Sequence, residues 1–303
     1  MIEVENLSKR YGRTLAVDRL SFTVRPGRVT GFLGPNGAGK SSTMRMILDL
    51  DAPTSGRIRV NGGRYRDLRD PLRHVGSLLE AGSVHGGRRA RDHLRWLARA
   101  GRIPESRVRE VIELVGLQSV AGKRAKGFSL GMGQRLGIAA ALLGDPGILV
   151  LDEPVNGLDP EGVRWIRGLM KSLAAEGRTV FVSSHLMSEM ALTADHLVVI
   201  GRGRVLADLG MTEFIERNSR SHVRIRTPEP ERMRDVLTAA GARVRQADDG
   251  FLEAFETDAA RVGDLAAANG LTVHEVSTWS ASLEEAFMRL TAEATEHRAG
   301  AER

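Results

Sequence analysis

The sequence predicts an α/β fold built around a phosphate-binding loop, followed by a small C-terminal α+β domain of the ferredoxin-like type. Three observations support this prediction. A glycine-rich loop ending in Lys-Ser stands between a strand pattern and a helix pattern, and a later apolar run ends in two carboxylates. The last part of the chain alternates short strand and helix patterns. We therefore expect two domains, at residues 1–219 and 220–303.

The phosphate-binding loop runs from Gly34 to Ser42 and fits the pattern G-x-x-x-x-G-K-[ST]. Residues 28–33 before it have the composition of a buried strand, and residues 41–50 after it have the apolar spacing of an amphipathic helix. Its glycines let backbone N–H groups approach phosphate oxygens, where the helix also points its positive end. Lys40 adds a charge, and the Ser41 hydroxyl is a ligand for Mg²⁺. A glycine-rich turn without a ligand is the alternative, which the Lys-Ser pair disfavours.

The carboxylate pair follows residues 147–151, an all-apolar run of the kind found in parallel strands buried on both faces. Carboxylates at the carboxyl end of such a strand lie beside the phosphate loop. Asp152 can hold Mg²⁺ directly or through water, and Glu153 can polarise the water that attacks a γ-phosphate. Two solvated acids at a strand end would be a plausible explanation for either residue alone, but a weak one for both together.

Composition narrows the possible partners of the chain. Its net charge is +6, with +10 on residues 1–219 and −4 on the remainder, and aromatic residues make up only 4%. The basic part suits a polyanionic nucleotide, whereas stacking on single-stranded nucleic acid would need more aromatics. Residues 88–99 fit a solvated helix face better than a phosphate-backbone patch. The chain has no cysteine, which is consistent with a reducing cytoplasm, and no apolar run near the roughly 20 residues of a membrane helix.

Three further segments complete an ordered set of motifs: residues 128–135, 156–160 and 180–185. Together with the loop and the carboxylate pair, they resemble the nucleotide-binding subunit of an ATP-binding-cassette (ABC) transporter, over residues 1 to about 219. The resemblance implies a P-loop NTPase cassette with a mixed-sheet core and a helical subdomain. It also implies ATP and Mg²⁺ as cofactors.

The same resemblance implies roles for individual residues. Tyr11 is similar to the aromatic that stacks on adenine, and Ser129 and Gly131 match the signature segment that contacts ATP in the opposing subunit. Asp159 matches the loop that links the two sites, and His185 matches the histidine that reaches the γ-phosphate. ATP would be bound through Tyr11, Asn36, Gly37, Ala38, Gly39, Lys40, Ser41 and Ser42, with Ser129, Gly131 and Asp159 acting across a dimer. The implied catalytic residues are Glu153, His185 and Glu80, and the implied metal ligands are Ser41, Asp152 and Glu80.

The sequence departs from the family pattern at three positions. Glu80 stands where the family usually has Gln, Leu130 where the signature usually has Gly, and Met132 where Gln is common. An acid at position 80 can still ligate Mg²⁺ and align water, but it adds negative charge beside a triphosphate. These departures resemble the bacitracin and daunorubicin exporter branch, so we interpret them as marks of that subfamily.

The C-terminal part shows a βαββαβ pattern that is typical of a ferredoxin-like sheet. Residues 211–218 are expected to form a linking helix. The expected strands are residues 221–226, 242–245, 251–255 and 271–276, and the expected helices are residues 231–240, 259–268 and 283–294. The apolar stripe of the last helix is expected to pack within its own domain.

The function implied by the resemblance is that of an ATP-hydrolysing subunit. Two identical chains would sandwich two ATP molecules head to tail and drive a separately encoded transmembrane permease that exports a drug, antibiotic or other small molecule. The chain would lie in the cytoplasm, at the inner face of the membrane, with no nucleic-acid partner. The alternative is a cytosolic ABC ATPase acting on ribosomes or DNA, but those types usually have a second cassette or a long coiled coil. A regulator without turnover would lack Glu153 or His185.

Overall fold

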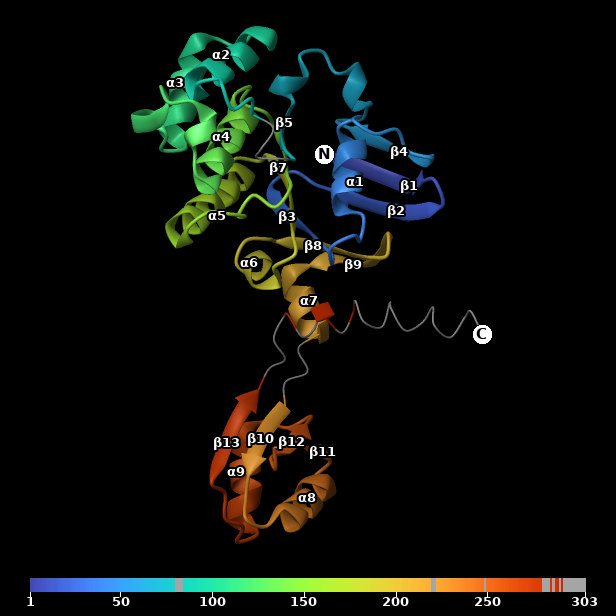
Figure 1. The fold of residues 1–303 in the computed structure, drawn as a ribbon. Helices are drawn as coiled ribbons and strands as arrows, with labels where there is room; N and C mark the ends of the chain where they lie inside the picture. Colours follow the sequence, from blue (N-terminus) through green and yellow to red (C-terminus); the bar gives the residue numbers. More distant parts are fainter. Residues whose placement is uncertain are drawn as a thin grey trace. The chain divides into compact units, whose positions relative to one another are not determined.

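The computed structural model describes residues 1–79, 84–218, 222–247, 249–279, 284, 287, 288 and 290 (Figure 1). Its contacts divide the chain into two compact units, one built on residues 1–211 and the other on residues 212–288. The expected linking helix is present as α7 (Met211–Asn218). The boundary that we predicted near residue 219 follows this helix, whereas the contacts group residues from Thr212 onward with the second unit.

The first unit contains a six-stranded sheet whose first five strands are parallel, while the last is antiparallel to its neighbour. Across the sheet the strands are β5 (Val75–Leu78), β6 (Ile148–Leu151), β7 (Thr179–Ser184), β3 (Arg28–Leu33), β8 (His196–Gly201) and β9 (Arg204–Gly210). The mixed sheet confirms the predicted core. Every residue of β6 and β7 is buried, as their apolar sequences predicted. The carboxyl ends of β3, β6 and β7 therefore meet at one sheet edge.

A three-stranded antiparallel sheet completes the core of this unit. Its strands are β2 (Thr14–Val24), β1 (Ile2–Tyr11) and β4 (Ser55–Val60). The rings of Phe22, Phe32 and Phe181 pack with centroids 5.1–5.8 Å apart, and thereby join this sheet to strands β3 and β7. The first helix, α1 (Lys40–Ile47), packs into the same core and ends before the predicted limit at residue 50.

Helices α2 (Ala90–Ala100), α3 (Glu105–Leu114) and α4 (Leu130–Leu142) pack against one another as the predicted helical subdomain (Figure 1). The segment expected to be a solvated helix face forms α2, which buries Leu94 and Ala98 and exposes Arg91 and Arg99. Two more helices follow the carboxylate strand and β7: α5 (Pro160–Ala175) and α6 (Met187–Ala191). Helix α5 packs on β3 and β7. Among the described residues, no helix has the length and apolar character needed to cross a membrane.

The second unit has the predicted βαββαβ order. Its elements are β10 (His222–Arg226), α8 (Pro230–Ala239), β11 (Arg243–Gln246), β12 (Leu252–Phe255), α9 (Ala259–Ala268) and β13 (Glu275–Trp279). The four strands lie in the order β11-β12-β10-β13, and all neighbours are antiparallel, which is the ferredoxin-like arrangement. The expected helix at residues 283–294 lies largely outside the described residues.

The last strand of this sheet begins later than predicted. We expected residues 271–276, but β13 begins at Glu275. Gly270 takes a positive φ of 62°, and the N–H of Leu271 then bonds back to the carbonyl of Ala266 at 2.9 Å. Leu271 therefore caps the C-terminus of helix α9, and its side chain packs into the core of the second unit. Pairing with β10 begins only where the His274 N–H bonds to the Arg226 carbonyl at 2.8 Å.

Candidate nucleotide site

The phosphate-binding loop turns sharply into α1 at Gly39, where φ is 103°. A Cβ atom at this position would lie 2.6 Å from the carbonyl oxygen of Ala16, so both backbone conformation and space require glycine. The close approach brings β2 against the loop and forms one wall of a cavity of about 250 Å³. The residues lining this cavity are Ala16, Asn36, Gly37, Gly39, Lys40, Ser41, Ser42, Asp152 and Glu153.

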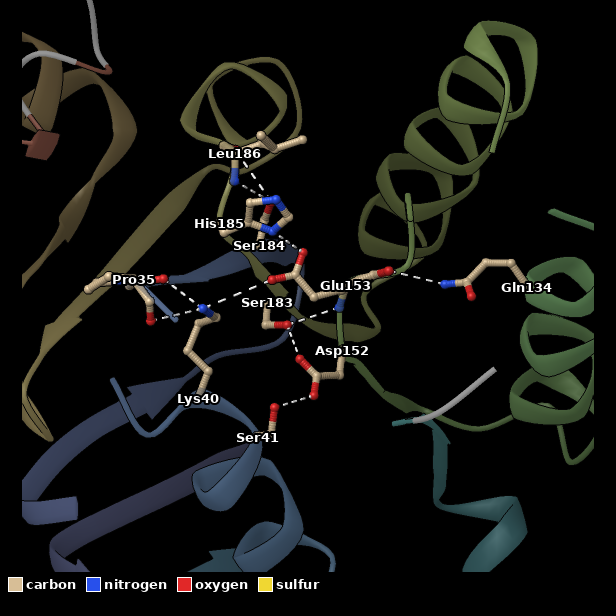
Figure 2. Close-up of polar contacts among 11 residues, drawn as sticks. Pro35, Lys40, Ser41, Gln134, Asp152, Glu153, Ser183, Ser184, His185 and Leu186 are labelled. Atoms are coloured by element: carbon tan, nitrogen blue, oxygen red, sulfur yellow. Dashed lines mark hydrogen bonds and ion pairs between the residues drawn. The ribbon is translucent and has the colours of Figure 1, made fainter. Parts of the chain in front are cut away.

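Lys40 is the buried cation of this site, with a side chain only 7% exposed. Its Nζ donates to the carbonyl oxygen of Gly34 at 2.6 Å and to that of Pro35 at 3.4 Å, and lies 4.0 Å from Oε1 of Glu153 (Figure 2). Burial lowers the pKa of Lys40, while the charges of Glu153 and Asp152 act in the opposite direction. The loop therefore holds its ammonium group directly opposite the carboxylate strand.

Asp152 joins three elements at the sheet edge. Ser41, in the first turn of α1, donates its hydroxyl to Asp152 Oδ2 at 2.7 Å. Ser183, near the end of β7, donates its hydroxyl to Asp152 Oδ1 and accepts the Glu153 N–H at 3.0 Å. The phosphate loop, β6 and β7 are thus connected through one carboxylate and two hydroxyls (Figure 2).

Glu153 has a backbone φ of 48°, an uncommon conformation for a residue with a side chain. Hydrogen bonds to its N–H and to its carbonyl hold the backbone of Glu153 in this conformation. Its N–H donates to Ser183, and its carbonyl accepts a 3.1 Å hydrogen bond from Nε2 of the buried Gln134 on α4. Its carboxylate Oε2 lies 2.8 Å from Nδ1 of His185, which follows β7 (Figure 2). Such strain persists only where neighbouring contacts enforce it, and it fixes the direction of the carboxylate.

Two of the residues expected to act across a dimer cap helices within this chain. The Ser129 hydroxyl accepts the Met132 N–H at 3.2 Å at the start of α4, and Asp159 accepts the Gly162 N–H at 2.8 Å at the start of α5. Gly131 packs closely, since a Cβ there would lie 2.8 Å from the carbonyl oxygen of Gly157. None of these three residues lines the cavity at the loop. Serine at position 129 and aspartate at position 159 are therefore explained by helix capping alone, with no need for a bound nucleotide.

The remaining predicted site residues occupy other positions. Tyr11 is 45% exposed, donates its hydroxyl to Asp51 at 2.9 Å and has the Lys9 ammonium 4.8 Å from its ring centroid. It does not line the cavity. Ala38 is buried, and its N–H bonds to the Pro35 carbonyl at 3.1 Å. Glu80 lies outside the described residues.

Three residues of the site were not assigned roles from the sequence: Ser183, Gln134 and Ala16. Gln134 lies in the motif segment 128–135 and Ser183 in the segment 180–185. Both residues therefore lie in segments recognised from the sequence, but the residues that they contact were not predicted. Their contacts with Asp152 and Glu153 join residues 19 to 31 positions apart in sequence, which motif spacing does not reveal. Ala16 contributes only its backbone carbonyl, which no sequence pattern marks.

Comparison with known proteins gives matches along both units. A family model described as ABC transporter matches residues 17–156, and a model described as a domain of unknown function matches residues 221–284. The chain is 36% identical over 299 residues to a bacitracin transport ATP-binding protein, BcrA, of Bacillus licheniformis, covering 96% of this chain and 97% of the relative. It is 37% identical over 208 residues to a lantibiotic transport ATP-binding protein, SrtF, of Streptococcus pyogenes, covering 69% of this chain and 90% of the relative.

A solved structure described as the ATP binding subunit of an ABC transporter superposes with a TM-score of 0.66 at 27% sequence identity. The match covers 72% of this chain and 92% of the solved chain. The superposable part is thus smaller than the part that aligns with BcrA, whose likeness extends over nearly the whole sequence.

Proposed function

This chain belongs to the ATP-binding subunits of ABC transporters, and from that premise we propose that two copies of it power a separately encoded permease that exports an antibiotic. Binding and hydrolysis of ATP follow from the family. The names of the bacitracin and lantibiotic relatives support a peptide antibiotic or similar compound as the exported substrate. The observation that carries the hydrolytic role is the contact of Glu153 with His185 opposite Lys40.

ATP is proposed to bind with its phosphates in the loop and its adenine on Tyr11. Backbone N–H groups between Asn36 and Ser42 would donate to the phosphate oxygens, and the start of α1 would add its positive end. Lys40 would exchange its carbonyl partners for the outer phosphates. This exchange is favourable because a charge-assisted hydrogen bond to phosphate is stronger than one to a neutral carbonyl.

Mg²⁺ is proposed to be held by Ser41 and Asp152, whose oxygens lie 2.7 Å apart. A hydroxyl and a carboxylate are hard oxygen donors of the kind that Mg²⁺ prefers. In the part of the chain that the structure describes, no group of three or more His, Cys, Asp or Glu side chains is suited to hold a metal. One carboxylate and one hydroxyl fit an ion whose other ligands are phosphate oxygens and water. When bound, the ion would neutralise charge developing on the phosphates. Glu80 is proposed as a further ligand.

Hydrolysis is proposed to begin with a water placed beside the Glu153 carboxylate. Glu153 orients and polarises this water as it attacks the γ-phosphate. His185 holds the carboxylate through Nδ1. With both ring nitrogens protonated, its Nε2 would donate to the γ-phosphate. The backbone contacts of Glu153 with Ser183 and Gln134 keep the carboxylate in position, so little reorganisation is needed during the reaction.

The dimer is proposed to place Ser129 and Gly131 of each chain against the ATP bound by the other, with Asp159 linking the two sites. A two-fold arrangement needs only one complete set of motifs, because each appears twice. Loss of the γ-phosphate would open the interface and move the permease at the inner face of the membrane.

Replacing Glu153 tests the hydrolytic proposal. Glu153→Gln keeps the shape of the side chain but removes its basicity, so we expect ATP hydrolysis to fall about 100-fold or more while ATP binding is retained. ATP-bound dimers should accumulate in size-exclusion chromatography. Glu161→Gln, in the exposed first turn of α5, is the matched control and should hydrolyse ATP at the parent rate. A parent-like rate for Glu153→Gln would show that the role assigned to Glu153 is wrong.

The export proposal is tested in cells that lack the gene. Such cells should become more susceptible to bacitracin or to a lantibiotic, and the wild-type gene should restore resistance. The Glu153→Gln gene should fail to restore it. Unchanged susceptibility to both compound classes would contradict the proposed substrate without affecting the assignment of the ATPase site.

A further inference from the structure

The ferredoxin-like sheet of the second unit has two chemically different faces. Val223 and Ile225 of β10 point into the core formed with α8 and α9, and Leu252 and Ala254 of β12 join them there. Because side chains alternate along a strand, the intervening residues lie on the opposite face. That face carries arginines and aromatic rings, and we call it the arginine–aromatic face. Its members are His222, Arg224, Arg226, Arg243, Arg245, Phe251, Glu253, Phe255, Glu275, Ser277 and Trp279.

The strand register arranges these residues in rows across the sheet. The first row places Phe255 between Arg243 and His222, with Trp279 beyond His222. The second row runs from Arg245 through Glu253 and Arg224 to Ser277, and a third row pairs Arg226 with Glu275. Aromatic side chains are therefore concentrated in the first row, and charged side chains occupy most of the second and third rows.

The guanidinium groups lie over the rings. Arg224 is 4.1 Å from the ring centroid of Phe251 and 5.5 Å from that of Trp279. Arg243 is 4.8 Å from the Phe255 ring centroid, and Arg226 is 5.5 Å from that of Phe251. A guanidinium stacked on a ring keeps its planar edge of N–H donors free for a carboxylate or a phosphate. These contacts thus hold the arginines in the sheet face, and they leave the donors of Arg226 and Arg243 free.

More than half of the arginines between residues 222 and 279 lie on this face. Residues 222–279 contain seven arginines and ten acidic residues, and four of the arginines lie on the arginine–aromatic face. Arg224 pairs with Asp249, and Arg245 pairs with Glu253 at 2.7 Å. Arg226 and Arg243 are both exposed, and neither makes an ion pair with another described residue.

The face also contains buried polar atoms that make no hydrogen bond with a described residue. They are both ring nitrogens of His222 and Nε of Arg224, although His222 Nε2 lies 3.8 Å from Oε1 of Glu253. His222 packs between Phe255 and Trp279, at centroid distances of 5.2 and 6.1 Å. Buried polar atoms usually have partners, so these atoms are a second sign that the face meets another molecule.

We propose that the arginine–aromatic face binds an extended acidic segment of a partner protein, with two carboxylates on Arg226 and Arg243 and apolar side chains on the rings between them. Arg243 lies two strands away from β10, level with His222. Arg226 lies four residues further along β10, so the two arginines are separated both across the sheet and along the strands. With about 4.8 Å between strands and 3.4 Å per residue, this separation is roughly 17 Å. An extended peptide covers that distance in about five residues, so the two acidic residues should be about five positions apart.

The acidic residues of the face favour a peptide over a nucleic acid. Glu253 lies in the row between those of the two free arginines, and Asp249 and Glu275 stand nearby. A nucleic-acid backbone would bring phosphates past Glu253, where like charges repel. A peptide with carboxylates only at its two ends avoids this repulsion. Arginine and aromatic residues are also the types enriched where protein partners bind most strongly.

The test uses the full chain and a displayed library of random twelve-residue peptides. We expect selection on the immobilised chain to enrich peptides with two acidic residues four to six positions apart around an aromatic or aliphatic residue. A selected peptide should bind in fluorescence anisotropy, and Arg226→Glu/Arg243→Glu should weaken its binding at least tenfold. The control Arg232→Glu, on the exposed side of α8, should bind like the parent chain. ATP affinity should be the same in all variants.

A charge-reversal experiment separates loss of the site from loss of the fold. The selected peptide with lysines in place of its two acidic residues should bind the Arg226→Glu/Arg243→Glu chain better than the parent chain. The proposal is overturned if no spaced acidic pattern is enriched, or if the double variant binds the acidic peptide as well as the parent does. It is also overturned if a twelve-nucleotide oligothymidine binds more tightly than the peptide and loses binding in the double variant.

Discussion

At the scale of single residues, the site depends on a buried cation opposite two carboxylates. Lys40 is 7% exposed and donates to two loop carbonyls while Glu153 lies 4.0 Å away. Burial lowers its pKa, and the nearby carboxylates oppose this shift. The loop therefore places the Lys40 side chain where phosphates would need a cation, and its loss should affect nucleotide binding more than folding.

Lys40→Ala should weaken binding of ATP and Mg²⁺ by about 1.5–3 kcal/mol, the range for a hydrogen bond to a charged group. This corresponds to roughly a tenfold to hundredfold higher Kd. Isothermal titration calorimetry measures the change directly. Lys171→Ala, on the exposed side of α5, serves as the control and should not change the Kd. An unchanged affinity for Lys40→Ala would remove the basis for the phosphate-loop assignment.

Two glycines of the loop provide a second comparison between single residues. Gly39 and Gly37 both have positive φ, but a Cβ at Gly39 would lie 2.6 Å from the Ala16 carbonyl, whereas a Cβ at Gly37 would have no neighbour within 4 Å. Both Ala variants should lose about 1–2 kcal/mol because of the left-handed backbone. Gly39→Ala should be the less stable of the two in thermal unfolding and should bind ATP more weakly. Equal effects would mean that the contact with Ala16 does not shape the loop.

At the scale of elements, Gln134 connects the helical subdomain to the catalytic strand. It is 4% exposed on α4, the helix that Ser129 caps, and its Nε2 donates to the Glu153 carbonyl. A movement of α4 would therefore act on the backbone of the residue that we propose as the base. The link runs through one hydrogen bond to a backbone held at a positive φ.

Gln134→Leu should lower kcat about tenfold, because it leaves the Glu153 carbonyl unsatisfied, at a cost of about 1–3 kcal/mol. The KM for ATP should change little, since Gln134 does not line the nucleotide cavity. Steady-state ATPase kinetics give both values. Gln118→Leu, at an exposed 3₁₀ turn, is the control. A raised KM with an unchanged kcat would instead indicate a binding role.

The elements also show how far the sequence predicts the fold. Strands β3, β6 and β7 were predicted because each is rich in apolar residues and is followed by, or ends in, a motif. The three strands of the antiparallel sheet, β1, β2 and β4, were not predicted from the sequence. The pairing of β1 with β2 shifts register several times, and Asn6 and Arg19 take positive φ, so the alternation of apolar and polar residues that marks a strand is broken.

The candidate site was predictable to a similar extent. Lys40, Ser41, Asp152, Glu153 and His185 were recognised from motif order, and the structure brings them together at one sheet edge. The bridging contacts of Ser183 and Gln134 arise only when β6, β7 and α4 pack. Tertiary contacts of this kind leave no periodic signal in the sequence.

At the scale of the whole molecule, the open question is whether each chain completes the site of the other. Ser129 caps α4 within its own chain and does not line its own nucleotide cavity, so its proposed role in the dimer is separable from ATP binding by the monomer. Ser129→Asn retains a good helix cap and is the control for stability of α4.

Ser129→Arg should abolish cooperative ATP hydrolysis but leave ATP binding by the monomer nearly intact, because the bulky cation would clash only when two chains close on the nucleotide. Mixing this variant with Lys40→Ala sharpens the measurement. In the mixed dimer one site combines both lesions, while the other pairs an intact loop with an intact signature segment and should recover activity if the sites work independently. Recovery would fail if the sites are strictly coupled, so the single variant decides. Normal hydrolysis by Ser129→Arg alone, at protein concentrations that favour the dimer, would refute the proposed action of this segment on the partner's ATP.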